Sequence, residues 1–146
     1  MYYLIGIGLA LAAFFFARFI GLDRDRAFYP TVMIVIALLY GLFAAIGESA
    51  TALILESIGI VAFILLAVLG FKSSLWLVAV ALFGHGVYDF FHPHLFVNPG
   101  VPIWWPEFCM AYDVTAAAGL AWLLMRPARA DAQAARKAVS APGFCG

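Results

Sequence analysis

Charge is what this sequence has least of. Only 11% of its 146 residues are Asp, Glu, Lys or Arg, whereas soluble domains carry about a quarter. Hydrophobic residues make up 66% of the chain. A chain of this size cannot bury so much apolar surface inside a globule, so much of that surface must face lipid. The composition excludes an ordinary soluble domain and predicts a one-domain integral membrane protein.

Further absences narrow the functional classes. The formal net charge is zero, so no basic surface for nucleic acid is expected. Two cysteines, Cys109 and Cys145, are too few for a disulfide framework. The sequence also lacks a phosphate-binding glycine loop, a dinucleotide fingerprint and a repeat of solenoid length. Its chemistry must therefore depend on a small number of polar side chains.

Five apolar segments are long enough to cross a bilayer, which takes about 20 residues. They cover residues 2–20, 30–47, 51–70, 74–92 and 104–125. Short polar or proline-rich stretches connect them, and Ser73 or Ser74 is expected to cap the fourth. The sequence thus predicts an all-α fold with a five-helix transmembrane domain over residues 1–126. A cytoplasmic tail over residues 127–146 is expected to be disordered beyond Val139.

The basic residues predict the orientation of the bundle. With five spans, all eight Lys and Arg fall on one side: Arg18, Arg24, Arg26, Lys72, Arg126, Arg129, Arg136 and Lys137. Because loops rich in Lys and Arg stay in the cytoplasm, this side is predicted to be cytoplasmic. The N-terminus is then outside and the C-terminus inside.

One short stretch holds all three histidines of the chain, between Gly84 and His94. His85, Asp89 and His92 follow at i, i+4 and i+7, which places them on one face of a helix. Pro93 is expected to end that helix or bend it sharply. The fourth helix is therefore predicted to carry a polar stripe to its own end.

Two other helices are expected to bring acids to the same depth. Glu56, His85 and Asp113 each lie about 8–10 Å below the predicted outer surface, at about 1.5 Å of rise per residue. Three ionisable groups on three helices predict a polar layer. In the inner half, by contrast, the only polar groups expected are Thr31, Tyr40, Ser73 and Ser74.

This layer lacks a basic partner, which leads to a metal hypothesis. A carboxylate buried in hydrocarbon costs about 2.5–3.5 kcal/mol unless a proton, a hydrogen bond, a cation or a metal compensates it. Imidazole and carboxylate are ligands of zinc and of non-haem iron or manganese. The predicted metal ligands are His85, Asp89, His92 and Glu56. Glu56 and Asp113 are the predicted catalytic carboxylates, and zinc is the favoured divalent ion, with iron and manganese as alternatives.

Each of these residues also has a simpler interpretation. His85 and Asp89 can form a plain hydrogen-bonded pair, Glu56 can be a neutral acid, and Asp113 can bond Thr115. The other polar residues of the outer half also have simple interpretations. Glu48 and Glu107 are interpreted as helix-end charges, His94 as a loop residue and Cys109 as an inert packed thiol.

Two motifs carry a resemblance. They are Gly-His-x-x-x-Asp-x-x-His, from Gly84 to His92, and Trp-Trp-Pro-Glu-Phe-Cys-Met-Ala-Tyr-Asp, from Trp104 to Asp113. Over residues 20–125 the chain resembles a group of small bacterial membrane proteins of unknown function, which implies the bacterial cytoplasmic (inner) membrane.

A looser likeness joins the chain to zinc-dependent membrane hydrolases of the alkaline-ceramidase and progestin-receptor type. The residues of matching kind are His85, Asp89, His92 and Glu56. The chain departs from that family in having five predicted helices rather than seven and no His-x-x-x-His pair.

Three functional hypotheses follow. The first is a metal-dependent membrane enzyme, a hydrolase or an oxidoreductase, acting on a lipid or another hydrophobic small molecule from the bilayer. The second is a proton or solute transporter, for which the inner half offers no matching polar path. The third is a structural or accessory subunit whose polar cluster fixes helix packing. The sequence leaves the oligomeric state open.

Overall fold

The computed structural model describes residues 1–24 and 26–126 of the chain. These residues form five long α-helices and one 3₁₀ turn: α1 (Tyr2–Ile20), η1 (Leu22–Arg24), α2 (Phe28–Ile46), α3 (Ala50–Lys72), α4 (Leu75–Leu95) and α5 (Trp105–Met125). Each of the five is long and apolar enough to cross a membrane. The all-α fold with five helices of membrane-spanning length is confirmed for the described residues, and the predicted tail with Cys145 lies outside them.

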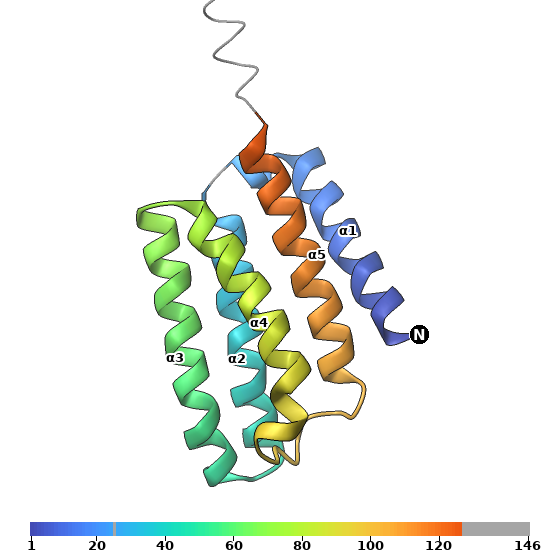
Figure 1. Cartoon of the computed structure of the whole chain (residues 1–146), viewed down its shortest axis with the longest axis vertical. Coiled ribbons are helices and arrows are strands. Elements are labelled where there is room, and N and C mark those ends of the chain that lie inside the picture. The colour runs from blue at the N-terminus through green and yellow to red at the C-terminus, as the bar shows by residue number, and fades with distance from the viewer. Residues whose placement is uncertain (25, 127–146) are drawn as a thin grey trace, which may run out of the picture.

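The helices run up and down in a bundle (Figure 1). Helix α5 lies between α1 and α4, α4 also packs against α3, and α3 packs against α2. Helix α2 contacts α4 as well, so α2, α3 and α4 form one side of the bundle and α1 lies at its edge against α5. The α2–α3 and α4–α5 connections meet at one end of the bundle, which brings the long loop after α4 close to the start of α3 (Figure 1).

Local sequence signals account for most helix ends. Ser49 begins α3 by accepting a hydrogen bond from the Ala52 N–H, and Ser74 begins α4 by accepting one from the Trp76 N–H. Both are ordinary serine N-caps, and Ser74 is one of the two residues predicted for this role. Gly21 ends α1 in the left-handed region, with φ 89°, a conformation that glycine adopts without strain.

The prediction that α4 ends at His92 is wrong. The helix continues through Pro93 to Leu95. A proline inside a helix removes one backbone hydrogen bond to the residue four positions earlier, and here that loss falls in the last turn, where few bonds depend on it. His92 therefore keeps the helical register that aligns it with His85 and Asp89.

The opposite end of the bundle is tied together by Arg26, in the connection before α2. Its guanidinium donates to the backbone carbonyls at the end of α3, those of Gly70, Phe71 and Ser73. The last carbonyls of a helix have no partner within the helix, and a basic side chain satisfies them well. This contact fixes the start of α2 against the end of α3.

Two glycines allow the close approaches on which the site depends. At Gly86 of α4, an added Cβ would lie 3.0 Å from Val114 Cγ2 and 3.2 Å from the Met110 carbonyl oxygen, both on α5. At Gly100, in the loop after α4, an added Cβ would lie 1.8 Å from the Phe43 carbonyl oxygen of α2. Only a residue without a side chain fits against another backbone in this way.

The exterior of the bundle is largely apolar. Large hydrophobic side chains on all five helices face outwards, among them Leu4, Phe19, Ile54, Val80 and Met125. Such a surface would be costly in water and is the ordinary surface of helices in lipid. With its five apolar spans, the chain has the architecture of a multi-pass membrane protein.

Candidate functional site

The buried polar side chains of the described residues come from α3, α4, α5 and the loop after α4. They are Glu56, His85, Asp89, His92, Asn98 and Asp113, each no more than 7% exposed. As predicted, three helices contribute buried polar side chains to one layer. It divides into two adjoining parts.

The first part is formed by α4 and α5. His85 and Asp89 project from α4, Cys109 and Asp113 from α5, and one potential ligand atom of each lies within 4.8 Å of all the others. Each helix supplies an i, i+4 pair, which lies on one face. All four side chains are buried. We call these residues the four-residue group.

The distances within this group are short. His85 Nδ1 lies 2.7 Å from Asp113 Oδ2 and 3.5 Å from Asp89 Oδ2. The Cys109 thiol lies 3.8 Å from the same Asp113 oxygen. Two carboxylate oxygens, Asp89 Oδ2 and Asp113 Oδ1, are buried without a hydrogen-bond partner among the described residues. Buried polar atoms are nearly always satisfied, so these two oxygens mark a place where a positive ligand would be stabilised.

Tyr40 of α2 completes the surroundings of Asp89. Its hydroxyl donates to Asp89 Oδ1 over 2.7 Å, and the tyrosine is 1% exposed. The expectation that Tyr40 belongs to the inner half is wrong. Helix α2 starts from the arginine-bearing connection, so a residue in its second half lies near the opposite end, at the level of Asp89.

The second part joins α3 to the end of α4. Glu56 Oε1 lies 2.7 Å from His92 Nε2. Tyr88 donates to Glu56 Oε2 over 2.8 Å, and the Asn98 amide donates to Glu56 Oε1 over 2.8 Å. Both oxygens of this carboxyl group are thus satisfied, unlike those of the four-residue group. We call this the Glu56–His92 pair.

Tyr40 connects the two parts. Its ring stacks on the His92 ring with 4.2 Å between centroids, while its hydroxyl bonds Asp89. Its backbone carbonyl accepts from the Asn98 amide over 3.1 Å. The polar residues therefore form one continuous network across four helices and a loop.

The predicted site residues fall on both parts. His85 and Asp89, predicted as ligands, lie together with Asp113, predicted as catalytic, in the four-residue group. Glu56 and His92, also predicted as ligands, bond each other next to it. Their role as ligands stays a prediction.

Sequence reasoning missed four partners. Cys109 is buried, as a packed thiol would be, and its i, i+4 spacing to Asp113 also places it in the four-residue group. Tyr88 lies on the same stripe as His85 and His92, three positions after one and four before the other, and could have been found there. Tyr40 and Asn98 had no comparable signal, because one belongs to an otherwise apolar helix and the other to a loop.

The simpler interpretations of other polar residues can also be compared with the structure. Glu48 and Glu107 are exposed, in agreement with their interpretation as helix-end residues. His94 is exposed too, but it lies in the last turn of α4 and not in a loop, because the helix continues to Leu95. The suggested bond between Asp113 and Thr115 is not formed, because the Thr115 hydroxyl donates to the Ala111 carbonyl oxygen.

The charges of the network favour a divalent cation. It contains three carboxyl groups and two imidazoles, so ionised acids and protonated histidines together leave one negative charge. A divalent ion in the four-residue group would neutralise Asp89 and Asp113 while Cys109 stays a thiol, and Glu56 and a protonated His92 would balance each other. If Cys109 binds the ion as the thiolate, one negative charge stays on the group.

The distances in the four-residue group are near those around a metal ion. Ligand atoms around tetrahedral zinc are separated by about 3.3–3.7 Å, given metal–ligand bonds of about 2.0–2.3 Å. The separation of 3.5 Å lies within that range and the separation of 3.8 Å lies just above it. The 2.7 Å contact is a hydrogen-bond distance, and His85 and Asp113 would have to move apart by about 0.6 Å or more to share a metal.

No protein-family model matches this chain, and neither the curated proteins nor the solved structures contain a match. What this site does must therefore be argued from its own residues.

Proposed function

We propose that this chain binds a divalent metal ion in the four-residue group, with zinc favoured over iron and manganese. One observation carries the proposal: four buried side chains of metal-ligating type converge within 4.8 Å, and two of their carboxylate oxygens have no partner among the described residues. A cysteine sulfur among the ligands, which binds a metal as the thiolate, favours zinc or iron over magnesium and calcium, which prefer oxygen ligands alone.

The reaction we propose is metal-dependent chemistry on a lipid or another hydrophobic molecule. A bound ion would supply Lewis-acid polarisation of a carbonyl or activation of water. Glu56 is oriented for proton transfer by three hydrogen bonds, from His92, Tyr88 and Asn98, and general acid–base groups must be held in this way. A hydrolase is the first choice, and an iron-dependent oxidoreductase is its variant.

The metal proposal is tested on protein purified without chelators in mild detergent. Elemental analysis is expected to find about one zinc, iron or manganese ion per chain, and zinc added after chelation is expected to restore the same stoichiometry. A chain that contains no stoichiometric metal and takes up none on reconstitution would remove the metalloenzyme reading.

A structural or accessory role is the second candidate. The observation that favours it is the hydrogen bonding of the network, in which His85–Asp113, Tyr40–Asp89 and Glu56–His92 all lie at 2.7 Å. Such a network can fix the packing of four helices without any ion. If this is its only role, stability in detergent will not change on chelation.

Transport is the least supported function. The buried histidine, asparagine and acidic residues among residues 1–24 and 26–126 all belong to the network. In the half of the bundle near the arginine-bearing connections, the buried polar groups of these residues include the Asp23 carboxylate, which is paired with Arg18, and the Tyr29 hydroxyl, which has no hydrogen-bond partner among them. A relay across the membrane would need a connected set of such groups.

We also propose that the arginine-bearing end of the bundle faces the cytoplasm of a bacterium, with the N-terminus outside. The support is the positive-inside rule. Reporter fusions test it: an enzyme active only in the cytoplasm should work after Gly146, and one active only outside should work before Met1. Both ends on one side would refute the orientation.

A further inference from the structure

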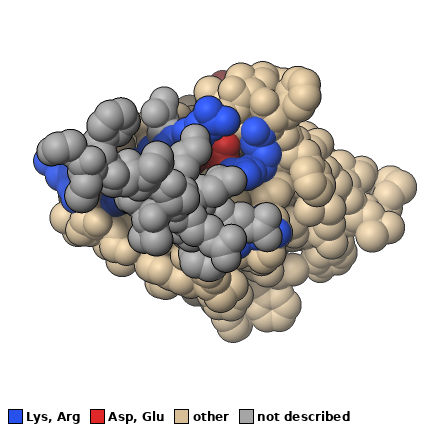
Figure 2. Space-filling model, turned by 90° about the horizontal axis from the view of Figure 1, so that it is seen from above, with Lys and Arg blue, Asp and Glu red and all other residues tan. Residues whose placement is uncertain are grey.

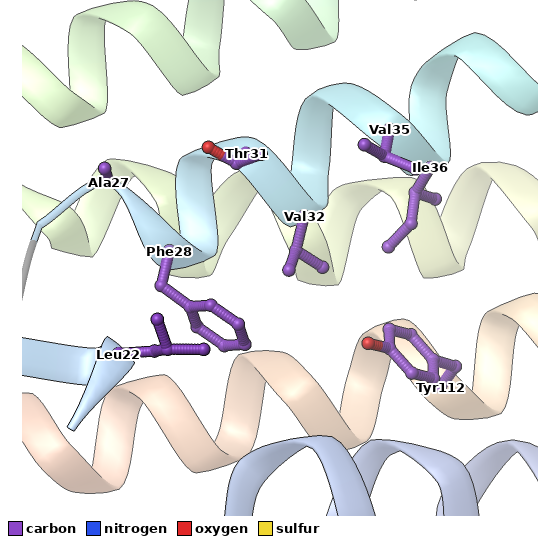
Figure 3. A pocket seen from close by; sticks show the side chains of 8 residues that line it. All are labelled: Leu22, Ala27, Phe28, Thr31, Val32, Val35, Ile36 and Tyr112. Atoms are coloured by element: carbon purple, nitrogen blue, oxygen red, sulfur yellow. The ribbon is translucent and has the colours of Figure 1, made fainter. Parts of the chain in front are cut away.

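A long apolar groove runs along α2 and α5, and it is bounded by η1 at one end and by α1 at the other. It consists of two cavities of about 410 and 580 Å³. Both are lined by Ile36 of α2 and Tyr112 of α5, so they join at this level. In Figure 3 the side chains of Phe28, Val32 and Ile36 point towards the same space as Tyr112.

The part of the groove along α2 from Ala27 to Leu39 has about the length of a lipid chain in one leaflet. From Ala27 to Leu39, both of which line it, α2 rises about 18 Å at about 1.5 Å per residue. One leaflet of a bilayer contributes about 15 Å of hydrocarbon. Because α1 and α2 both expose apolar side chains to the membrane, the groove is open to lipid along its side.

The two ends of the groove differ in charge. Leu22, which lines the first cavity, lies between Arg18 and Arg24 in the chain. Both arginines are exposed, and Arg18 forms an ion pair with Asp23. Lys and Arg side chains gather on this end of the molecule (Figure 2). Its described charges are five basic residues against one acid: Arg18, Arg24, Arg26, Lys72 and Arg126 against Asp23. At the opposite end the described residues include Glu48 and Glu107 and no Lys or Arg.

We propose that the groove binds one acyl chain of an anionic phospholipid, with the phosphate-containing headgroup at the Arg18–Arg24 end. An apolar channel takes hydrocarbon, and the basic end is complementary to a negative headgroup. The charge distribution gives the lipid one direction, with its chain running from Leu22 towards Leu39.

The far end of the groove reaches the polar network. Cys109 lines the second cavity and belongs to the four-residue group. A chain in the groove would therefore end beside the Cys109 side chain, close to Trp104 and Trp105 of the same cavity. This lipid site does not depend on a metal, since all of its lining side chains except Thr31 are apolar or aromatic.

Native mass spectrometry of the full chain tests the proposal. Detergent-solubilised protein is mixed with equal amounts of phosphatidylglycerol and phosphatidylcholine that have the same acyl chains. We expect one retained phosphatidylglycerol per chain and about a fivefold preference over phosphatidylcholine, since one surface arginine is worth a factor of about five and Arg18 is already paired with Asp23. Metal content is measured on the same sample, so failure of the lipid site and failure of the metal site are read separately.

Matched variants on α2 locate the lipid. Val32→Trp fills the groove where Figure 3 shows Val32 pointing into it, and is expected to lower lipid retention about tenfold. Leu38→Trp adds the same ring at an outward-facing position, 47% exposed, which does not line the groove, and is expected to retain lipid like the wild type. Equal retention by both variants would overturn the proposal.

A third measurement needs no variant and therefore survives misfolding of Val32→Trp. Phosphatidylglycerol with a diazirine near the chain end is photolysed on the wild-type protein, and the label is expected around Leu39 and Cys109. Three outcomes would each refute the proposal: labelling spread evenly over the α3 surface, no preference for the anionic lipid, or a lipid-free dimer that separates on Val32→Trp. The last of these would identify a second copy of the chain as the occupant of the groove.

Discussion

Replacing Asp113 by asparagine is the sharpest test of the metal site. The change keeps the shape of the side chain but removes one negative charge and one ligand. Asp113 is fully buried and lies 2.7 Å from His85 Nδ1 and 3.8 Å from the Cys109 thiol. Loss of supporting groups around a metal costs about 10- to 100-fold in affinity, so a weakening of about 100-fold is a modest expectation for a ligand.

The size of the thermal effect follows from mass action. A metal ion present at about 100 times its dissociation constant stabilises the folded wild-type chain by about 2.7 kcal/mol. For Asp113→Asn the same ion concentration equals the weakened dissociation constant, and only about 0.4 kcal/mol remains. In proteins of about this size, 1 kcal/mol corresponds to about 2–4 °C. Chelation should therefore lower the wild-type Tm by about 5–11 °C and the variant Tm by about 1–2 °C.

The assay is thermal unfolding in detergent, followed by tryptophan fluorescence with and without chelator. Glu107→Gln is the matched control, because it removes a carboxylate from the same helix at an exposed position. This control should keep the wild-type response to chelation. If Asp113→Asn and the wild type lose the same Tm on chelation, Asp113 is not a ligand; if neither loses any, the four-residue group holds no metal.

Two further variants separate the parts of the network. Glu56→Gln should keep metal content within about twofold of wild type by elemental analysis. The same change should lower the free energy of unfolding by about 1–3 kcal/mol in chemical unfolding, because the amide nitrogen cannot accept the Tyr88 hydrogen bond. Loss of metal would instead make Glu56 a ligand, as the sequence predicts. Gly86→Ala should weaken metal binding about tenfold by competition titration, because its Cβ would meet Val114 and the Met110 carbonyl and push α4 away from α5. The control Gly84→Ala, whose Cβ meets only Phe63 at 3.9 Å, should bind normally, and equal affinities would show that helix spacing does not control the site.

The fold could be predicted from the sequence because its helices are determined by patterns along the chain and not by tertiary contacts. Runs of about 20 apolar residues, interrupted by charged or proline-rich connections, define the five helices. The serine caps are equally local. The error at Pro93 arose because proline disfavours a helix interior without forbidding the last turn. Tertiary packing of the loop after α4, which brings Asn98 onto Tyr40 and Glu56, decides the outcome there.

The candidate site could be predicted only in part. Helical spacing identified the stripe on α4, and depth identified Glu56 and Asp113 as its neighbours. Neither signal determines how helices rotate about their axes, and this rotation decides which acid meets which histidine. Asp113 meets His85 and Glu56 meets His92, a pairing that no spacing within one helix can encode. Tyr40 was misplaced because its depth was judged without following the direction of α2.

The distribution of charge explains why the network needs an ion or a proton from outside. Among the described residues every Lys and Arg lies at one end of the bundle, while the buried carboxyl groups lie towards the other. An arginine within reach would have neutralised Asp89 and Asp113 permanently and filled their open coordination positions. Two imidazoles cannot balance three carboxylates, so one positive charge is missing. If the network only fixes helix packing, a proton would supply this charge. If the chain is a metalloenzyme, a metal ion would supply it, and chelation would remove only the metal ion.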